Sequence, residues 1–441
     1  MKLTVIGCGH LGATHAAAMA ELGHQVLGLD LDPDKVTVLN SGRAPFHEPG
    51  LDELLARHTA SGRLRFTTDQ DEAAAFAELH FLGIGTPLGP DGAYDLRALH
   101  AAVRGLAARL TGPAVVVGKS TVPVGTAAEL LVLLQKAPYG AELCWNPEFL
   151  RESRAVEDTL RPDRLVLGFA EHGGRAEALV REAYQGIIGA GTPVVVTDLA
   201  TAELAKSAAN AFLATKISFV NAMAEVCEAA GADVEVLTEA LGYDARIGRR
   251  GMRAGVGFGG GCLPKDLLGF AARAGELGAD SAVGLLREVG AVNGRRRERT
   301  VALARELLDG TLAGRRITVW GAAFKPGTDD IRDSPALAVS DALHRAGATV
   351  TVTDPRALDN ARKALPHLTY ADDPTEALTG ADLLLHLTEW PEYTHLDPAA
   401  LAPHMSTNAN TSTPKVIDGR HTLDPTTWRT AGWTYRALGR P

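Results

Sequence analysis

A glycine-rich segment carries the residue best suited to covalent chemistry. It reads GFGGGCLPKD from Gly257 to Asp266, with Cys262 immediately ahead of the LPKD sequence. Pro264 suits the first turn of a helix, which places the thiol just before a helix N-terminus, where the thiolate form is favoured. The consecutive glycines let a backbone approach a ligand closely. With Asp266 in that first turn, the segment predicts a nucleophilic cysteine rather than a buried structural one.

Two further pairs of polar residues have spacings that suit chemistry. Lys206 and Asn210 are one helical turn apart and share a face, where they fit a donor pair for an oxyanion. Spacing alone favours a different interpretation, a polar stripe on a solvated helix. Glu148 and Glu152 follow a strand-like run. They fit acid–base groups, acceptors for sugar hydroxyls or the first turn of a capped helix, and spacing does not separate these.

The start of the chain carries the glycine pattern of a dinucleotide site. The sequence GCGHLG places Gly7, Gly9 and Gly12 between a strand-like run and a helix-like run. These glycines permit a tight turn and a close approach of a pyrophosphate to the helix N-terminus. Asp30 ends the next strand-like run, where a carboxylate accepts a ribose 2′-hydroxyl and repels a 2′-phosphate, so NAD is predicted over NADP. Lys35 fits the adenosine side of that site and equally a surface position.

Two hydroxyl side chains follow later strand-like runs. Thr86 stands in the sequence GIGTP, and Thr121 stands in KSTVP. Ligands bind at the carboxyl ends of strands in open α/β sheets, so both threonines are candidate ligand contacts as well as turn residues.

Two α/β regions with a helical region between them are needed to position these side chains. Strand-like runs alternate with Ala-rich helical runs in the first half, which indicates a parallel sheet covered on both faces. The strand-like runs are Lys2–Ile6, Gln25–Leu29, His80–Leu82, Ala114–Val117 and Leu165–Leu167, and the helical runs include His15–Leu22 and Leu96–Leu110. The same alternation of strand-like and helix-like runs returns near the C-terminus. Strands are predicted at Arg316–Trp320, Thr349–Thr353, Leu383–Leu387 and Val416–Asp418, and a helix near Ser334–Ala346.

The middle of the chain predicts one long helix. Thr201–Ala230 contains no glycine or proline and repeats apolar residues at helical spacing, with Asp198 and Thr201 as candidate N-caps and Gly231 as its end. A helix of about 30 residues spans roughly 45 Å, enough to connect two domains and to offer a face to a second subunit. The predicted domains are residues 1–198, 199–300 and 312–441.

Length and composition exclude several classes. The chain has 441 residues, of which 46% are apolar and 22% charged, globular proportions with length for about three domains. A net charge of −9 argues against a general nucleic-acid binder, and Arg295–Arg297 is interpreted as a solvated helix face. No apolar run is long enough for a membrane span, and the N-terminus enters a strand-like run rather than a signal peptide. Four isolated cysteines without CxxC spacing predict no metal site, no disulfide framework and a cytoplasmic location.

Several separated motifs, in order, are similar to those of the UDP-glucose/GDP-mannose dehydrogenase family. They are VIGCGHLG, GRAPFHEPGLDELL, GIGTP, KSTVPVGT, NPEFLRES, ELAKSAANAF, DARIG, GVGFGGGCLPKD, GAAFKPGTDDIRDSP and IDGR. The resemblance covers essentially the whole chain. Two positions depart from the family's pattern, since Gly261 stands where serine is frequent and His10 where tyrosine or valine is common.

The resemblance implies a fold and a reaction. The fold is α/β, with two Rossmann-like doubly wound domains flanking a helical central domain, whose long helix lies in the core of a homodimer or larger homo-oligomer. NAD binds the first domain, and the nucleotide sugar binds the central and C-terminal domains. The implied reaction is a four-electron oxidation of a sugar C6 alcohol to a carboxylate, with two NAD consumed per sugar.

The resemblance also assigns roles by motif. Cys262 forms a thiohemiacetal and then a thioester, which water hydrolyses. Lys206 and Asn210 become a charge-stabilising pair, in contrast to the interpretation from spacing alone. The residues that orient or activate water are Asp266, Thr121 and Glu152. The implied cofactor contacts are Gly7, Gly9, His10, Leu11, Gly12, Asp30, Lys35, Thr86, Thr121, Glu152 and Arg332. The implied substrate contacts are Glu148, Phe149, Leu150, Glu152, Lys206, Asn210, Arg246 from a neighbouring subunit, Phe258, Gly259, Lys325 and Arg420.

The NPEFLRES and AVEDTLRPDRLVLG sequences favour the UDP-glucose branch of the family. GDP-mannose and other UDP-sugar dehydrogenases share the cysteine motif and remain alternatives. A two-electron alcohol dehydrogenase is the nearest rival enzyme, and it needs no thiol. A nucleotide sensor without turnover would keep the glycine loops but has no use for Cys262, Lys206, Asn210 and Asp266 together.

Overall fold

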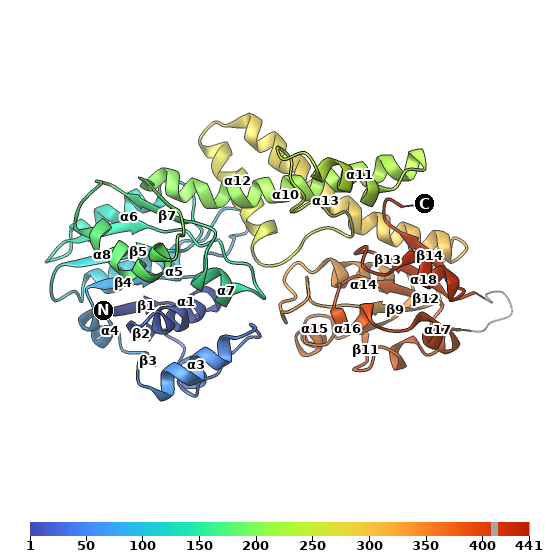
Figure 1. Ribbon diagram of the computed structural model, residues 1–441, viewed down its shortest axis with the longest axis horizontal. Helices are drawn as coiled ribbons and strands as arrows, with labels where there is room; N and C mark the ends of the chain where they lie inside the picture. The colour runs from blue at the N-terminus through green and yellow to red at the C-terminus, as the bar shows by residue number, and fades with distance from the viewer. Residues whose placement is uncertain (407–412, 441) are drawn as a thin grey trace. The chain divides into compact units, whose positions relative to one another are not determined.

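The computed structural model describes residues 1–406 and 413–440 (Figure 1). The chain divides into two compact units, Met1–Ala209 with Ala272–Gly278 and Asn210–Ala271 with Ala279–Pro441. Residues 407–412 and 441 of the predicted C-terminal domain lie outside the described residues. The predicted division into three domains stays a prediction.

An eight-stranded sheet forms the centre of the first unit. Its strands are β1 Lys2–Ile6, β2 Gln25–Leu29, β3 Leu64–Thr67, β4 Leu79–Leu82, β5 Ala114–Gly118, β6 Ala141–Trp145, β7 Leu165–Phe169 and β8 Val194–Asp198. They lie in the order β3-β2-β1-β4-β5-β6-β7-β8, and every neighbouring pair is parallel except β6 and β7. The chain reverses direction across the sheet between β1 and β4, the type of position where doubly wound sheets bind ligands.

Helices cover both faces of this sheet, as the alternation of buried side chains requires. Val115 and Val117 of β5 pack into one apolar cluster with α1, while Ala114 and Val116 pack into another with α5 and α6. Because successive side chains of a strand point to opposite faces, a strand buried on both sides carries an unbroken apolar run. The helices are α1 His10–Glu21, α2 Pro33–Asn40, α3 Leu51–Ala60, α4 Gln70–Phe76, α5 Arg97–Ala107, α6 Thr126–Gln135, α7 Ala155–Leu160, α8 Arg175–Ala183 and α9 Gln185–Gly189.

Most predicted elements of this unit are confirmed, and their ends needed correction. β1 and β2 match their predicted ranges, but α1 begins at His10 and not at His15, because the glycine turn delivers the chain directly into the helix. β3 and β8 were not predicted. β3 alternates buried and exposed residues over only four positions, and β8 contains no buried residue, so neither gives the pattern of a central strand.

Four helices form the middle of the chain: α10 Leu199–Ala230, α11 Val234–Gly242, α12 Leu263–Glu276 and α13 Asp280–Leu307. The long helix is confirmed, with two residues more at its start than predicted. Of the two candidate N-caps, Asp198 is confirmed, since its carboxylate accepts the Thr201 backbone N–H at 2.8 Å, whereas Thr201 lies inside the helix. Gly231 ends it with φ +71°, a conformation that glycine adopts without strain.

The second unit contains a six-stranded parallel sheet in the order β11-β10-β9-β12-β13-β14. Its strands are β9 Arg316–Trp320, β10 Thr349–Thr353, β11 Thr369–Tyr370, β12 Leu383–His386, β13 Lys415–Asp418 and β14 Thr434–Ala437. Its α-helices are α14 Pro335–Arg345, α15 Leu358–Ala364, α16 Pro391–Thr394, α17 Pro398–Leu401 and α18 Pro425–Thr430, and the short 3₁₀ helices are Glu376–Leu378 and Ala402–His404. This strand order repeats that of the first six strands of the other sheet, so both α/β regions are doubly wound as predicted.

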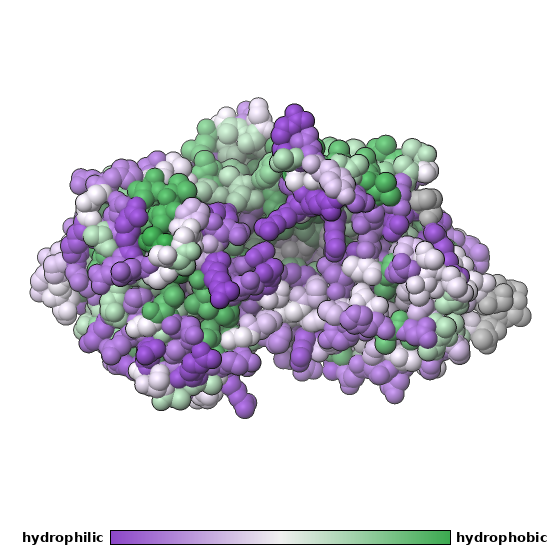
Figure 2. Space-filling view, in the orientation of Figure 1, coloured by the Kyte–Doolittle hydropathy of each residue, from purple (hydrophilic) through white to green (hydrophobic). Residues whose placement is uncertain are grey.

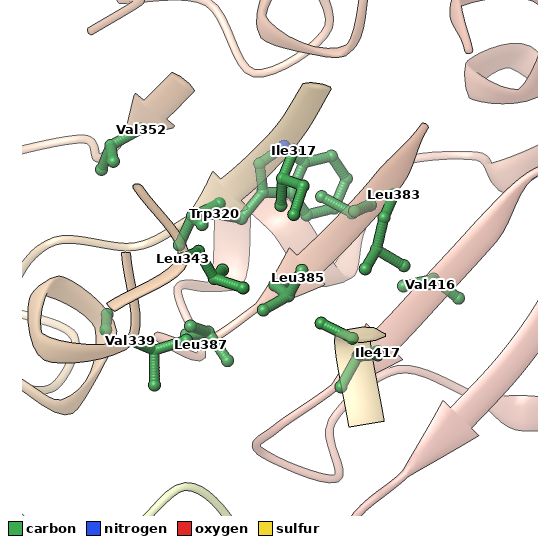
Figure 3. Packing of buried hydrophobic residues seen from close by; sticks show 14 of the residues in the cluster. Ile317, Trp320, Val339, Leu343, Val352, Leu383, Leu385, Leu387, Val416 and Ile417 are labelled. Atoms are coloured by element: carbon green, nitrogen blue, oxygen red, sulfur yellow. The ribbon is translucent and has the colours of Figure 1, made fainter. Parts of the chain in front are cut away.

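The core of this second sheet is a continuous apolar layer. Val339 and Leu343 of α14 lie beside Leu385 and Leu387 (Figure 3). Leu385 has no exposed surface, and β12 pairs with both β9 and β13. A central strand packed in this way fixes the loops that follow it.

Replacing Leu385 with alanine removes buried methyl groups without changing any polar contact. We expect Leu385→Ala to lower the free energy of unfolding by about 2–5 kcal/mol, measured by denaturant unfolding. The matched control is Leu277→Ala, since Leu277 is 59% exposed. Equal effects of the two substitutions would contradict the packing described for β12.

Candidate active site

The glycine turn after β1 is built for close backbone contact. Gly7 has φ +86°, and its N–H donates to the Leu29 carbonyl at 2.8 Å. A Cβ at Gly12 would overlap the Gly7 carbonyl oxygen, so helix α1 can start here only with glycine at that position. The turn leaves Gly9 exposed as the N-cap of α1, where backbone N–H groups and the helix dipole favour an anion.

Asp30 stands beside this turn in a defined orientation. Its Oδ2 accepts the Cys8 backbone N–H at 2.9 Å and the Lys35 ammonium at 3.0 Å. A cavity of about 430 Å³ is lined by the glycine turn, Asp30, Lys35 and the Gly83–Gly85 turn after β4. Lys35 therefore lines the same cavity as Asp30, and its contact with the adenosine side of a cofactor stays a prediction.

Thr86 and Thr121 come together at the carboxyl ends of β4 and β5. The buried Thr86 hydroxyl donates to the Thr121 carbonyl at 2.7 Å. This bond ties the two loops to each other, as expected for neighbouring strands that end at the same edge of a sheet.

His10 contacts a residue that the sequence analysis did not single out. Its Nε2 lies 2.9 Å from Oε2 of Glu48, whose side chain is fully buried. The Glu48 carboxylate also accepts the backbone N–H groups of Ser153 at 2.8 Å and Ala155 at 2.7 Å. Glu48 thus joins the start of α1 to the segment that carries Glu152.

The Glu148 carboxylate pairs with a buried lysine. Its Oε1 lies 2.9 Å from Nζ of Lys206, which is only 4% exposed, and its Oε2 accepts the Leu150 N–H at 2.6 Å. The Lys206 ammonium also lies 5.8 Å from the centre of the Phe149 ring. The interpretation of Lys206 as part of a solvated stripe is therefore wrong, because a solvated stripe would leave the ammonium exposed.

Glu148 and Glu152 do not start a helix. The chain is irregular from Asn146 to Arg154, and α7 begins only at Ala155. The capped-helix alternative for this pair is wrong, because the segment turns back on itself, with Ser153 at φ +67°. Both carboxylates are half-buried.

Cys262 is exposed and directly precedes α12, as predicted. Its carbonyl accepts the Asp266 backbone N–H at 2.8 Å, the first hydrogen bond of the helix. The Asp266 side chain is 1% exposed and accepts Nδ2 of Asn210 at 2.6 Å and Nζ of Lys265 at 2.6 Å. The other three cysteines are buried.

A second cavity, of about 450 Å³, lies in the unit that holds Cys262. Phe258, Gly259, Lys325 and Arg420 are among its lining residues. The Arg420 guanidinium donates to the Gly257 carbonyl at 3.0 Å and to the Phe324 carbonyl at 3.3 Å. Arg246 is not among the lining residues and instead pairs on the surface with Asp244 at 2.6 Å.

Three family models match successive stretches of the chain. They are the NAD binding domain of the UDP-glucose/GDP-mannose dehydrogenase family at residues 1–188, its central domain at 200–295 and its UDP binding domain at 318–425. The chain belongs to this family.

Full-length relatives agree with the family models. A UDP-glucose 6-dehydrogenase of Rhizobium meliloti is 42% identical over 100% of both chains. One from Pseudomonas aeruginosa is 39% identical over 100% of this chain and 98% of its own. The solved structure of a UDP-glucose dehydrogenase from Pyrobaculum islandicum is 37% identical and superposes with a TM-score of 0.91, over 100% of this chain and 98% of that one.

NAD is the cofactor of this family member, as its NAD binding domain indicates. The residues present fit that cofactor, because the close Gly7–Gly12 turn leaves Gly9 exposed and Asp30 is held in place beside it. Within the described ranges, no group of three His, Cys, Asp or Glu side chains is arranged to hold a metal ion. Over the same ranges, no helix has the length and apolar character to cross a membrane.

Glu203 is a second buried carboxylate that sequence reasoning missed. Its oxygens accept the backbone N–H groups of Gly125 at 2.8 Å and Ala127 at 2.5 Å. Arg273 donates to the neighbouring Val124 carbonyl at 2.9 Å. Glu203 therefore caps α6 and closes the loop that begins at Thr121. The ELAK motif contains this glutamate, but its partner lies far away in the sequence.

The charge of Glu203 makes stability depend on pH. Burial raises the pKa of Glu203 to about 7, although the two backbone N–H groups oppose that rise. A raised folded-state pKa favours folding most at low pH, and the advantage is lost as pH rises toward 7. We expect the stability of the unaltered protein relative to Glu203→Gln to fall by about 1–3 kcal/mol between about pH 5 and pH 8.

Denaturant unfolding at a series of pH values measures this difference. Glu171→Gln is the control, since Glu171 is exposed in the same unit and is not among the groups that shift the pKa of Glu203. Parallel pH profiles for the unaltered protein and Glu203→Gln would show that the carboxyl group is not desolvated in solution.

Proposed function

We propose that this protein oxidises UDP-glucose to UDP-glucuronate with NAD, as a UDP-glucose 6-dehydrogenase. The observation that carries the proposal is Cys262, an exposed thiol placed directly before helix α12 in the second unit. The names of the full-length relatives supply the substrate. A dehydrogenase that stops at an aldehyde has no need of a thiol in this position.

The reaction proceeds through two oxidations with the sugar held on the thiol. The first removes a hydride from C6 and the hydroxyl proton, which leaves an aldehyde. The Cys262 thiolate adds to the carbonyl carbon and forms a thiohemiacetal. Loss of a second hydride and of the hydroxyl proton gives a thioester, and water breaks the C–S bond to release the carboxylate and restore the thiol. NAD supplies the hydride acceptor for each oxidation.

Lys206 and Asn210 stabilise the negative oxygen in these steps. They stand one turn apart on α10, and each is oriented by a carboxylate, Lys206 by Glu148 at 2.9 Å and Asn210 by Asp266 at 2.6 Å. An ammonium and an amide held in place favour a developing oxyanion without reorganising during the reaction. Thr121 and Glu152 are assigned, with Asp266, to positioning the water that hydrolyses the thioester.

The cavity in the second unit fits the nucleotide part of the substrate. Lys325 and Arg420 line it with Phe258 and Gly259, so it offers positive charge for a diphosphate and an aromatic side chain for the sugar or base. The chain also matches the family's UDP binding domain over residues 318–425. GDP-mannose is the alternative substrate, because the thiol chemistry does not depend on the base.

Counting NADH formed per sugar consumed tests the proposed reaction. We expect about two NADH per UDP-glucose, and little turnover with GDP-mannose or UDP-N-acetyl sugars, followed by absorbance. One NADH per sugar would overturn the thioester role of Cys262. Preference for GDP-mannose would move the protein to the other branch of the family.

The variant Cys262→Ser supplies the control. It is expected to abolish acid formation, because serine at this position is a poor nucleophile, while NAD binding measured by calorimetry is retained. Loss of NAD binding in this variant would count against the separation of roles proposed here.

A homodimer is proposed from an apolar stripe on α10. Phe212, Phe219 and Val226 are 68%, 50% and 56% exposed and repeat every seven residues along one helix. Figure 2 shows further apolar residues over neighbouring α11, where Val236 is 63% exposed. Such a stripe is self-complementary when a second copy of the same helix covers it, as in an isologous interface.

Introducing a charge into this stripe tests the dimer. Phe219→Asp is expected to weaken self-association by about 100-fold or more, because a buried carboxylate would lack a partner. Sedimentation velocity measures the change, with Val132→Asp as the control because Val132 is exposed on α6 outside the stripe. A monomeric unaltered protein, or a Phe219→Asp variant that remains fully dimeric, would contradict the proposal.

The proposed setting is the cytoplasm. Cys8, Cys144 and Cys227 are buried as separate thiols, which suits a reducing compartment. The net charge of −9 supports a small-molecule substrate rather than nucleic acid.

A further inference from the structure

The loop that carries Cys262 packs directly on the loop that precedes α14. The Gly260 N–H donates to the Arg332 carbonyl at 2.9 Å. A Cβ at Gly259 would overlap the carbonyl oxygen of Asp333, so the two backbones approach more closely than any side chain permits. The position of the cysteine loop therefore depends on where Arg332 and Asp333 are held.

Helix α13 holds the cysteine loop at Phe258. Asn293 accepts the Phe258 N–H at 2.8 Å and donates to the Phe258 carbonyl at 3.0 Å. Both groups are buried, and this reciprocal pair fixes the first part of the loop to the helix.

One turn further along α13, Arg297 joins the two loops to each other. Its guanidinium lies 2.8 Å from the Asp333 carboxylate and donates to the carbonyls of Phe258 and Asp333, each at 3.3 Å. Asp333 has φ +46°, a conformation that aspartate adopts at a cost and that needs support from its surroundings. A planar guanidinium can reach three acceptors at once, which a lysine ammonium on a flexible stem does not reproduce.

The turn that Arg297 supports also places a second guanidinium. A Cβ at Gly261 would overlap the guanidinium of Arg332, so that charge lies against the residue next to Cys262. Asp330 holds the same guanidinium through bonds of 2.6–3.0 Å. A positive group beside a thiol favours the thiolate.

We propose that Arg297 is a positioning residue for the Cys262 nucleophile. By fixing the Asp333 turn against Phe258, it sets both the path of the cysteine loop and the distance of the Arg332 charge from the thiol. The inference rests on the proposed function, since it concerns the nucleophile of that reaction. It also corrects the interpretation of Arg295–Arg297 as a solvated face, because Arg295 is exposed but Arg296 is buried and Arg297 half-buried.

Arg295 provides a matched control two residues away. Its guanidinium pairs with Glu288 at 2.7 Å on the exposed side of the same helix. Replacing either arginine with glutamine removes one positive charge from α13 and preserves similar length. Only Arg297→Gln also removes the bridge between the two loops.

Two measurements on this pair of variants test the proposal. Arg297→Gln is expected to lower kcat about tenfold or more, because the nucleophile is displaced from its reacting position. Alkylation of Cys262 by iodoacetamide is measured by peptide mass spectrometry at a series of pH values. In Arg297→Gln, the midpoint of this pH profile is expected to lie about half a unit or more above that of the unaltered protein. Arg295→Gln is expected to leave both quantities unchanged, and Arg297→Lys to fall between.

Equal kcat for Arg297→Gln and Arg295→Gln, or an unchanged pH profile of alkylation, would overturn the proposal. If circular dichroism shows that Arg297→Gln does not fold, Asp333→Asn is used as the test instead. Asparagine tolerates positive φ, but it cannot form the 2.8 Å ion pair with Arg297. That variant is expected to shift the alkylation profile in the same direction, and no shift would reject the role. Alkylation needs no turnover, so an unaltered protein that forms no NADH would overturn the proposed function and leave this test intact.

Discussion

Carboxylates that accept backbone N–H groups hold several of the loops on which the proposed chemistry depends. Asp30 binds the glycine turn, Glu48 the segment after Glu152, and Glu203 the loop after Thr121. Asp418 does the same in the second unit, where it accepts the N–H groups of Arg420 and the two residues that follow nearby. A carboxylate taken out of water needs hydrogen-bond donors, and the backbone N–H groups of a loop need acceptors. Each of these hydrogen bonds therefore satisfies the carboxylate and the loop at once. These irregular loops are therefore held in place without regular secondary structure.

The aspartate after the second strand serves the two sheets differently, although six strands of each sheet follow the same order. Asp354 directly follows β10 as Asp30 directly follows β2, and both accept N–H groups from the turn after the first strand of their sheet. Asp354 additionally accepts Trp390 and two amides of its own loop, and it is 3% exposed. Its oxygens face inward, whereas Asp30 stands at the wall of a cavity. The second sheet thus uses the aspartate to hold its loop rather than to line a cavity.

Local sequence patterns predicted the helices and strands, whereas contacts with residues distant in the sequence determine the surroundings of the functional side chains. The glycine turn, the N-cap at Asp198 and the start of α12 at Cys262 depend on neighbours in the sequence, and the structure has them as predicted. The burial of Lys206 depends on Glu148, which lies in another part of the chain, so spacing on the helix gave the wrong environment. Glu203 and Arg297 were missed for the same reason, since a charged residue on a helix reveals nothing of the loop it will bind.

The paired charges of the candidate site also bear on how its nucleophile works. Lys206 is neutralised by Glu148, and Asp266 by Lys265, so each buried ion has its partner before any substrate arrives. An ion pair of this kind avoids the cost of an isolated buried charge, but it contributes little net field at a distance. In the proposed mechanism, the thiolate of Cys262 would draw on the N–H groups at the start of α12 and on the guanidinium of Arg332, which lies beside Gly261. Both act over short distances, so in this proposal the path of the cysteine loop sets the reactivity of the thiol.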